Sequence, residues 1–74
     1  MTNLAVWIAA DSSEVRIGDH VAVDLYPDAV GVIVGVNPDR GRPDVRLTEG
    51  ARAGKTVTVW PYQILLKVQR RPSA

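Results

Sequence analysis

The residues that could perform acid–base or metal chemistry are few, and they form no recognisable catalytic pattern. His20 is the only histidine and cysteine is absent, so one chain cannot build a zinc site from several histidines or thiolates. Asp24 and Asp28 flank a proline turn with no nucleophile or metal ligand nearby, which argues against a paired-carboxylate role. His20 follows Asp19 at an outward strand position, where a solvated imidazole is the favoured interpretation. The sequence therefore predicts no catalytic residue, no bound metal and no cofactor.

Recognition is the chemistry that the remaining side chains suit better. Trp60 precedes Pro61 and is either a lid over the core or a stacking surface for a base or a proline-rich peptide. Tryptophan is enriched at interface hot spots, and Trp7 could pack within its own chain or anchor a partner. We predict that a partner binds eight residues, which are Leu4, Val6, Trp7, Ile8, Arg40, Arg42, Trp60 and Tyr62.

The net charge of +1 conceals a separation of charge along the chain. Residues 1–39 carry six acidic and one basic side chain, whereas residues 40–74 carry eight basic and two acidic ones. Acidic residues interrupt the cations of the second half, so a salt-bridged surface is favoured over a phosphate-binding patch and nucleic acid is not the favoured partner. A molecule with two oppositely charged parts instead favours another protein or a second copy of itself.

The bulk composition describes one small globular domain. The chain has 74 residues, of which 46% are hydrophobic and 23% are charged, values that are ordinary for such a domain. The longest apolar run, residues 4–10, is far shorter than the roughly 20 residues of a membrane-spanning helix. A signal peptide would carry a Lys or Arg ahead of its apolar run, and no such residue precedes this one. We expect a protein that is neither membrane-bound nor secreted and is located in the cytoplasm or in a virion.

Alternating apolar and polar residues predict short strands and almost no helix. Residues 1–15 form a strand-like arm that either docks on another chain or folds back as an edge strand. Residues 16–69 form the domain proper, with a 3₁₀ turn at residues 62–65, and residues 70–74 form a short basic tail. The inward phase of the strands predicts a core of Val21, Val23, Val32, Val34, Val45, Leu47, Val57, Val59, Leu65 and Val68.

The end of the domain resembles a known type of small β-protein. In Val57-Thr58-Val59-Trp60-Pro61-Tyr62-Gln63-Ile64-Leu65 a strand reaches an aromatic–proline corner, and a tight turn leads into a last apolar strand. This order resembles an SH3-like barrel. Arg16-Ile17-Gly18-Asp19-His20-Val21-Ala22-Val23, followed by Gly31-Val32-Ile33-Val34-Gly35-Val36, is similar to the KOW-type barrel of ribosomal and elongation proteins. That resemblance implies nucleic-acid binding, although the intervening loop, residues 24–28, is acidic.

A second resemblance is to the type II plasmid dihydrofolate reductases, which are tetramers of SH3-like barrels. Three segments carry it, which are Gly18-Asp19-His20-Val21, Gly31-Val32-Ile33-Val34-Gly35 and Val57-Thr58-Val59-Trp60-Pro61. The family implies a pore lined by a glutamine and a tyrosine, but Thr58 and Trp60 occupy those places here. Reductase activity is therefore kept as an alternative and is not the preferred interpretation.

Together these patterns predict an all-β chain that forms a single SH3-like five-stranded barrel with an N-terminal arm and a basic tail. The expected function is that of a non-enzymatic interaction module. We expect a small subunit of a larger assembly, for example an accessory or decoration protein of a phage particle. A KOW-like nucleic-acid-binding module and a reductase-like oligomeric enzyme are the alternatives.

Overall fold

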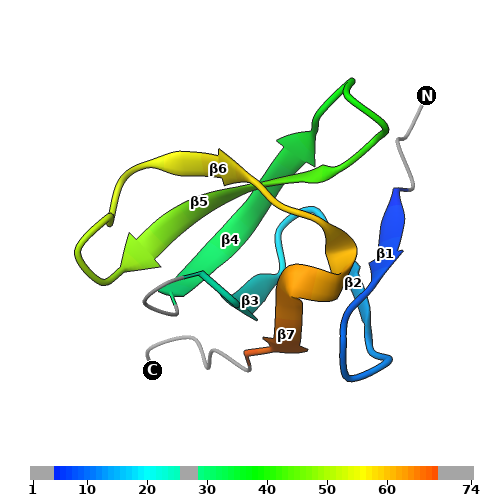
Figure 1. The fold of residues 1–74 in the computed structure, drawn as a ribbon, viewed down its shortest axis with the longest axis horizontal. Coiled ribbons are helices and arrows are strands. Elements are labelled where there is room, and N and C mark those ends of the chain that lie inside the picture. The colour runs from blue at the N-terminus through cyan, green and yellow to red at the C-terminus, as the bar shows by residue number, and fades with distance from the viewer. Residues whose placement is uncertain (1–4, 26–28, 69–74) are drawn as a thin grey trace.

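The computed structural model describes residues 5–25 and 29–68, and it confirms the predicted all-β class. Five strands form one antiparallel sheet in the order β6-β5-β4-β3-β7, and the first two form a separate hairpin (Figure 1). The elements are β1 (Val6–Ile8), β2 (Glu14–Arg16), β3 (His20–Val23), β4 (Ala29–Val36), β5 (Pro43–Glu49), β6 (Thr56–Thr58), the 3₁₀ turn η1 (Pro61–Gln63) and β7 (Ile64–Lys67).

The five-stranded sheet is a meander in which its last strand, β7, returns to lie beside its first strand, β3. β3 pairs with β4, β4 pairs with β5 and β5 pairs with β6, each with the next strand along the chain, whereas β7 pairs with β3. β6 and β7 are the two ends of the strand order, so no ladder between them closes the sheet. The turn η1 connects these two strands. In the described part of the chain no helix is long and apolar enough to cross a membrane.

The strand β4 bends because its register shifts twice against β5. One shift lies between Val30 and Gly31 and the other between Ile33 and Gly35. A Cβ atom on Gly31 would lie 2.6 Å from the carbonyl oxygen of Arg46, so only glycine allows the backbone of β5 to approach this closely. Gly31 is therefore a point of close approach between β4 and β5.

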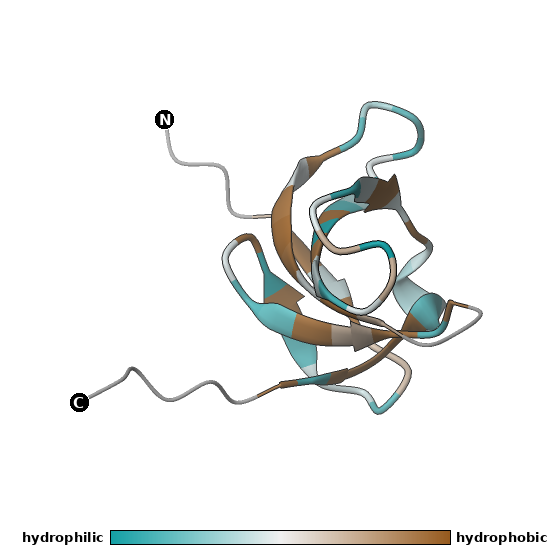
Figure 2. Cartoon of the chain, turned by 90° about the vertical axis from the view of Figure 1, so that its left-hand side faces the viewer, coloured by the Kyte–Doolittle hydropathy of each residue, from teal (hydrophilic) through white to brown (hydrophobic). Residues whose placement is uncertain are grey.

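The core consists of apolar side chains that the strands direct to one face, and Figure 2 shows the alternation of apolar and polar residues along them. Val21, Val23, Val45, Leu47 and Val59 were predicted there and are buried. The other members are Trp7, Ala9, Val15, Ile33 and Ile64. The described residues contribute no buried polar or charged side chain to this core.

Some residues predicted for the core are not fully buried, because in β4 and β7 the side chains that face inward are neighbours of the predicted ones. Ile33 is buried, whereas Val34 is 47% exposed and Val32 is half-buried. The shifts in β4 change which side chains face inward, and simple alternation cannot anticipate them. In the last strand Ile64 is buried and Leu65 is half-buried, because η1 ends at Gln63, two residues earlier than expected. Val57 and Val68 are half-buried as well.

The N-terminal segment folds onto its own domain. β1 and β2 form an antiparallel hairpin that pairs Trp7 with Val15, and both side chains belong to the core cluster. The amide N–H of Ala10 also donates to the carbonyl oxygen of Ile64 at 2.7 Å. The boundary predicted between residues 15 and 16 falls within β2. Of the two expectations for this segment, folding back is the one that the structure describes. The predicted tail, residues 70–74, lies outside the described residues.

Candidate functional site

Four of the predicted partner-binding residues meet on the surface. Arg40 and Arg42 come from the loop between β4 and β5, Trp60 follows β6, and Tyr62 lies in η1. The guanidinium carbon of Arg42 lies 4.3 Å from the centroid of the Trp60 ring, and that of Arg40 lies 5.9 Å from it. The rings of Trp60 and Tyr62 are stacked, with centroids 6.3 Å apart and planes 9° apart. We call these four residues the aromatic–arginine cluster.

The pairing of β5 with β6 brings the cluster together. The amide N–H of Val59 donates to the carbonyl oxygen of Pro43 at 3.1 Å, which extends the ladder and places the neighbouring residues Trp60 and Arg42 across from each other. Such cross-strand neighbours lie within reach of aromatic and long side chains. Cation–π attraction then holds the guanidinium over the indole.

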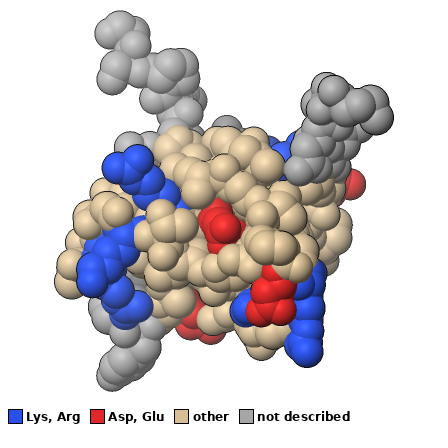
Figure 3. Space-filling model, turned by 90° about the horizontal axis from the view of Figure 1, so that it is seen from above, with Lys and Arg blue, Asp and Glu red and all other residues tan. Residues whose placement is uncertain are grey.

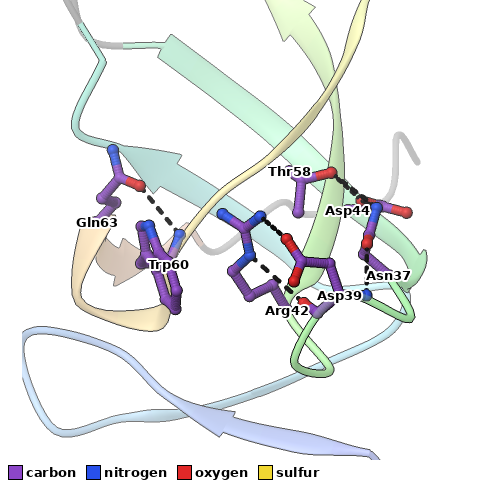
Figure 4. A network of polar contacts seen from close by, with 7 residues as sticks. All are labelled: Asn37, Asp39, Arg42, Asp44, Thr58, Trp60 and Gln63. Carbon is purple, nitrogen blue, oxygen red and sulfur yellow. Dashed lines mark hydrogen bonds and ion pairs between the residues drawn. The ribbon is translucent and has the colours of Figure 1, made fainter.

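Gln63 fixes the backbone of Trp60 at the end of the strand. Its side-chain Oε1 accepts a hydrogen bond from the Trp60 amide at 2.9 Å (Figure 4), and its own amide N–H donates to the Trp60 carbonyl oxygen at 2.9 Å. Pro61 begins the turn between them. This reciprocal pairing satisfies the main-chain N–H and the carbonyl oxygen of Trp60. The indole side chain therefore extends from a rigid corner of the backbone.

The loop that carries the two arginines is fixed by its own side chains. Asn37 Oδ1 accepts from the amide of Asp39 at 2.8 Å, and Arg42 forms an ion pair with Asp39 at 2.6 Å. Arg40 and Gly41 both have left-handed backbone angles, with φ of 62° and 66°. This conformation is uncommon for arginine, and it makes the sharp turn that carries the chain back into β5.

A half-buried network of polar side chains ties the start of this loop to β5 and β6. Thr58 donates its hydroxyl to Asp44 Oδ1 at 2.5 Å. The amide of Asn37 donates to Thr58 Oγ1 at 3.1 Å and to Asp44 Oδ1 at 3.3 Å (Figure 4). Neither Asn37 nor Asp44 was among the residues predicted to form the site. The turn signal Asn37-Pro38-Asp39 was the available clue, because asparagine often bonds to nearby backbone in such turns.

The three described partner-binding residues of the N-terminal segment divide into two roles. Trp7 is only 8% exposed, and its indole N–H donates to the carbonyl oxygen of Gly41 at 2.8 Å. Trp7 therefore supports the arginine-bearing loop from within its own chain. Val6 and Ile8 point the other way and are 41% and 54% exposed. Leu4 lies outside the described residues.

The other cations lie apart from the cluster. Arg52 and Lys55 lie in the loop between β5 and β6, at the opposite end of β5 from Arg40 and Arg42. Figure 3 shows Lys and Arg side chains along the left of this view and others at the lower right, beside acidic groups. The structure thus places the cations of these two loops at opposite ends of β5.

Several titratable side chains outside the cluster have distinctive surroundings. His20 Nδ1 is buried without a hydrogen-bond partner, and Lys67 approaches Asp19 at 3.5 Å. Hydrogen bonds from the Ser13 hydroxyl and amide hold the pKa of Asp11 below its ordinary value, but this carboxylate lies in an exposed turn. No three acidic or histidine side chains among the described residues converge to hold a metal ion.

No protein-family model, curated protein or solved structure matches this chain. The fold and the site are therefore interpreted from the residues themselves. The feature that they place most distinctly on the surface is the aromatic–arginine cluster, which combines a stacked pair of rings with two guanidinium groups.

Proposed function

We propose that this protein is a non-enzymatic interaction module that acts as a small subunit of a larger assembly. The aromatic–arginine cluster is its docking surface for a protein partner or for another copy of the chain. An accessory or decoration protein of a phage particle is one such role. The observation that carries the proposal is the meeting of Trp60, Tyr62 and Arg42 on the surface, because these three residue types dominate interface hot spots.

The organisation of the cluster supports binding with little loss of conformational entropy. Tyr62 is 69% exposed, yet its ring is already stacked on Trp60. Arg42 is held by Asp39, and its side chain is only 19% exposed. Side chains that are ordered before binding lose less freedom on association, so more of the contact energy appears as affinity.

The SH3-like character of the fold is part of the same proposal. The strand order supports it, because β7, the last strand of the five-stranded sheet, pairs with β3, the first strand of that sheet. A 3₁₀ turn, η1, directly precedes that last strand, as the resemblance to SH3-like barrels implies. Because small folds of this kind host many unrelated functions, we base the function on the cluster and not on the fold.

Binding of single-stranded nucleic acid is the second candidate, and one observation favours it. The exposed ring of Tyr62, stacked on Trp60, offers a face for a base, and Arg40, which lies over Trp60, offers a cation for a phosphate. The other guanidinium of the cluster, that of Arg42, is already neutralised by Asp39. This leaves a single cation for phosphates, so the protein partner is preferred.

The proposal predicts that the wild-type chain sediments in a complex much larger than its own 8.0 kDa when it is extracted gently from its source. Tyr62→Ala removes the most exposed ring of the cluster, and we expect this variant to sediment as the free chain. Val34→Ala is the matched control, because it truncates an exposed apolar residue of β4 outside the cluster. Circular dichroism verifies that both variants fold. A wild-type chain that sediments alone, or a Tyr62→Ala chain that stays in the complex, would contradict the proposal.

A further inference from the structure

The strand β6 lies at an open edge of the five-stranded sheet. It pairs only with β5, and Figure 1 shows it along the upper border with no other labelled element beyond it. An edge strand presents a row of main-chain N–H and C=O groups to which another extended chain can pair. This edge runs directly into the aromatic–arginine cluster, because Trp60 follows the strand after a single residue, Val59.

The hydrogen bonds at both ends of β6 establish which residues face β5. The amide of Leu47 donates to the carbonyl oxygen of Lys55 at 2.8 Å, and the amide of Val59 donates to that of Pro43 at 3.1 Å. In an antiparallel ladder the hydrogen-bonded positions recur at every second residue. Lys55, Val57 and Val59 therefore direct their main-chain groups toward β5.

Thr56 and Thr58 consequently direct their N–H and C=O groups away from β5, toward the open side. Within the part of the chain that the structure describes, neither residue has a main-chain partner on that side. The two sets of groups lie about 6.8 Å apart, which is the two-residue repeat of any extended chain. The edge thus offers two donors and two acceptors at the spacing that an added strand requires.

A cation lies at each end of this edge, and the one carboxylate opposite the described strand, that of Asp44 across from Thr58, already accepts hydrogen bonds from Thr58 and Asn37. Lys55 precedes the strand, and Arg46 lies opposite Thr56; both side chains are exposed. Arg40 lies beside Trp60 at the other end. None of these three cations forms an ion pair with a described residue.

We propose that the open edge of β6 is a strand-addition site for an extended, acidic segment of a partner protein. The segment pairs its main chain with Thr56 and Thr58, and its carboxylates meet Lys55 and Arg46 at one end and Arg40 at the other. A ring at its end stacks on the exposed face of Tyr62. The inference rests on the proposed function, for which it names the chemistry of the partner.

The same groups disfavour two other occupants. Two copies paired through β6 would place like charges at the same end of the shared edge, because Lys55 would meet Lys55 in a parallel pair and the end that carries Arg40 in an antiparallel pair. The backbone of DNA could accept hydrogen bonds from the amides of Thr56 and Thr58. It has no donor group, however, to satisfy the carbonyl oxygens of these two residues. A polypeptide strand supplies both donors and acceptors.

The test uses the full chain and a blocked synthetic peptide, Glu-Glu-Val-Thr-Val-Tyr-Glu, with a twin in which lysine replaces every glutamate. Amide hydrogen exchange is followed by NMR. Saturating acidic peptide should slow exchange at Thr56 and Thr58 at least about tenfold. Val57 should change little, because its amide is already bonded to β5. The lysine twin should bind at least about tenfold more weakly, because its charges repel the cations of the edge.

Variants separate the backbone of the edge from its side chains. Thr56→Pro removes an outward N–H without breaking the ladder to β5 and should weaken peptide binding about fivefold, the equivalent of one hydrogen bond. Thr56→Ala keeps that N–H and should bind as the wild type does. Where Thr56→Pro fails to fold, exchange in the wild-type chain still decides the question.

Several outcomes would overturn the inference. These are unchanged exchange at Thr56 and Thr58, equal binding of the lysine twin, protection that rises with protein concentration alone, and the same protection from a single-stranded oligonucleotide. A peptide that perturbs only Trp60 and Tyr62 would refute strand addition and leave the proposed function standing. If amide exchange at β6 slows but the Tyr62→Ala chain stays in its complex, the proposed docking surface would be refuted. The strand-addition site at the edge of β6 would still stand.

Discussion

At the scale of single residues, Trp7 links the interior of the domain to its candidate site. Its ring packs in the core, and its indole N–H donates to Gly41, which lies between the two arginines of the cluster. Tryptophan combines a large apolar surface with one polar group in this way, and when buried it usually finds a hydrogen-bond partner for that group. The position of the arginine-bearing loop thus depends on a residue about 35 positions earlier in the chain.

We predict that Trp7→Phe uncouples these two roles. The phenyl ring retains most of the packing, whereas the hydrogen bond to Gly41 is lost, so the free energy of unfolding should fall by about 1 kcal/mol. Urea denaturation measures this change. In the variant Trp60 is the only remaining tryptophan, and its fluorescence should report a looser contact with Arg42. An unchanged stability and an unchanged Trp60 signal would mean that the indole N–H does not position the loop.

The residues of the cluster were identifiable from the sequence, but their contacts were not. Tryptophan, tyrosine and arginine indicate recognition by type alone. Trp60 and Arg42 are 18 positions apart, however, and they meet only because of the register of β5 against β6. The polar network of Asn37, Asp44 and Thr58 was missed for the same reason, since it joins three elements that only the folded chain brings together.

At the scale of elements, the alternation of apolar and polar residues predicts the strands, but it does not predict the positions of the bulges. β3 and β5 keep a strict period of two, and their predicted inward residues are buried. β4 is apolar on both faces, so its sequence carries no information about phase. The close approach at Gly31 and the two register shifts then decide that Ile33 faces the core in place of Val34.

The phase of β4 leads to a prediction for two adjacent residues. Ile33→Ala should lower the free energy of unfolding by about 2–5 kcal/mol, because it removes buried methyl groups and leaves a cavity. Val34→Ser should change it by no more than about 0.5 kcal/mol, since this side chain is nearly half exposed. Chemical denaturation of the two variants under identical conditions compares them. The reverse ranking would support the register expected from simple alternation.

At the scale of the whole molecule, the N-terminal hairpin completes a core that the five-stranded sheet leaves open. Trp7 and Ala9 reach this core from β1 and its end, and Val15 reaches it from β2. A chain of this size buries only about 60% of its unfolded surface, so each large buried group is a sizeable part of its stability. The same hairpin exposes Val6 and Ile8 on its outer face, which leaves them available to a partner.

Deletion of residues 1–10 therefore tests the organisation of the entire domain. The truncated chain loses Trp7 and Ala9 from the core, the hydrogen bond from Ala10 to Ile64, and the support of the loop at Gly41. Removal of a buried tryptophan side chain alone costs about 3–5 kcal/mol, which is close to the total stability expected of so small a domain. We expect the deletion to abolish cooperative thermal unfolding, as followed by circular dichroism. The double variant Val6→Ser and Ile8→Ser is the control, because it alters only the exposed face of β1 and should unfold cooperatively. A truncated chain that still melts cooperatively would show that the hairpin is dispensable for the fold, and the segment would then be free to dock elsewhere.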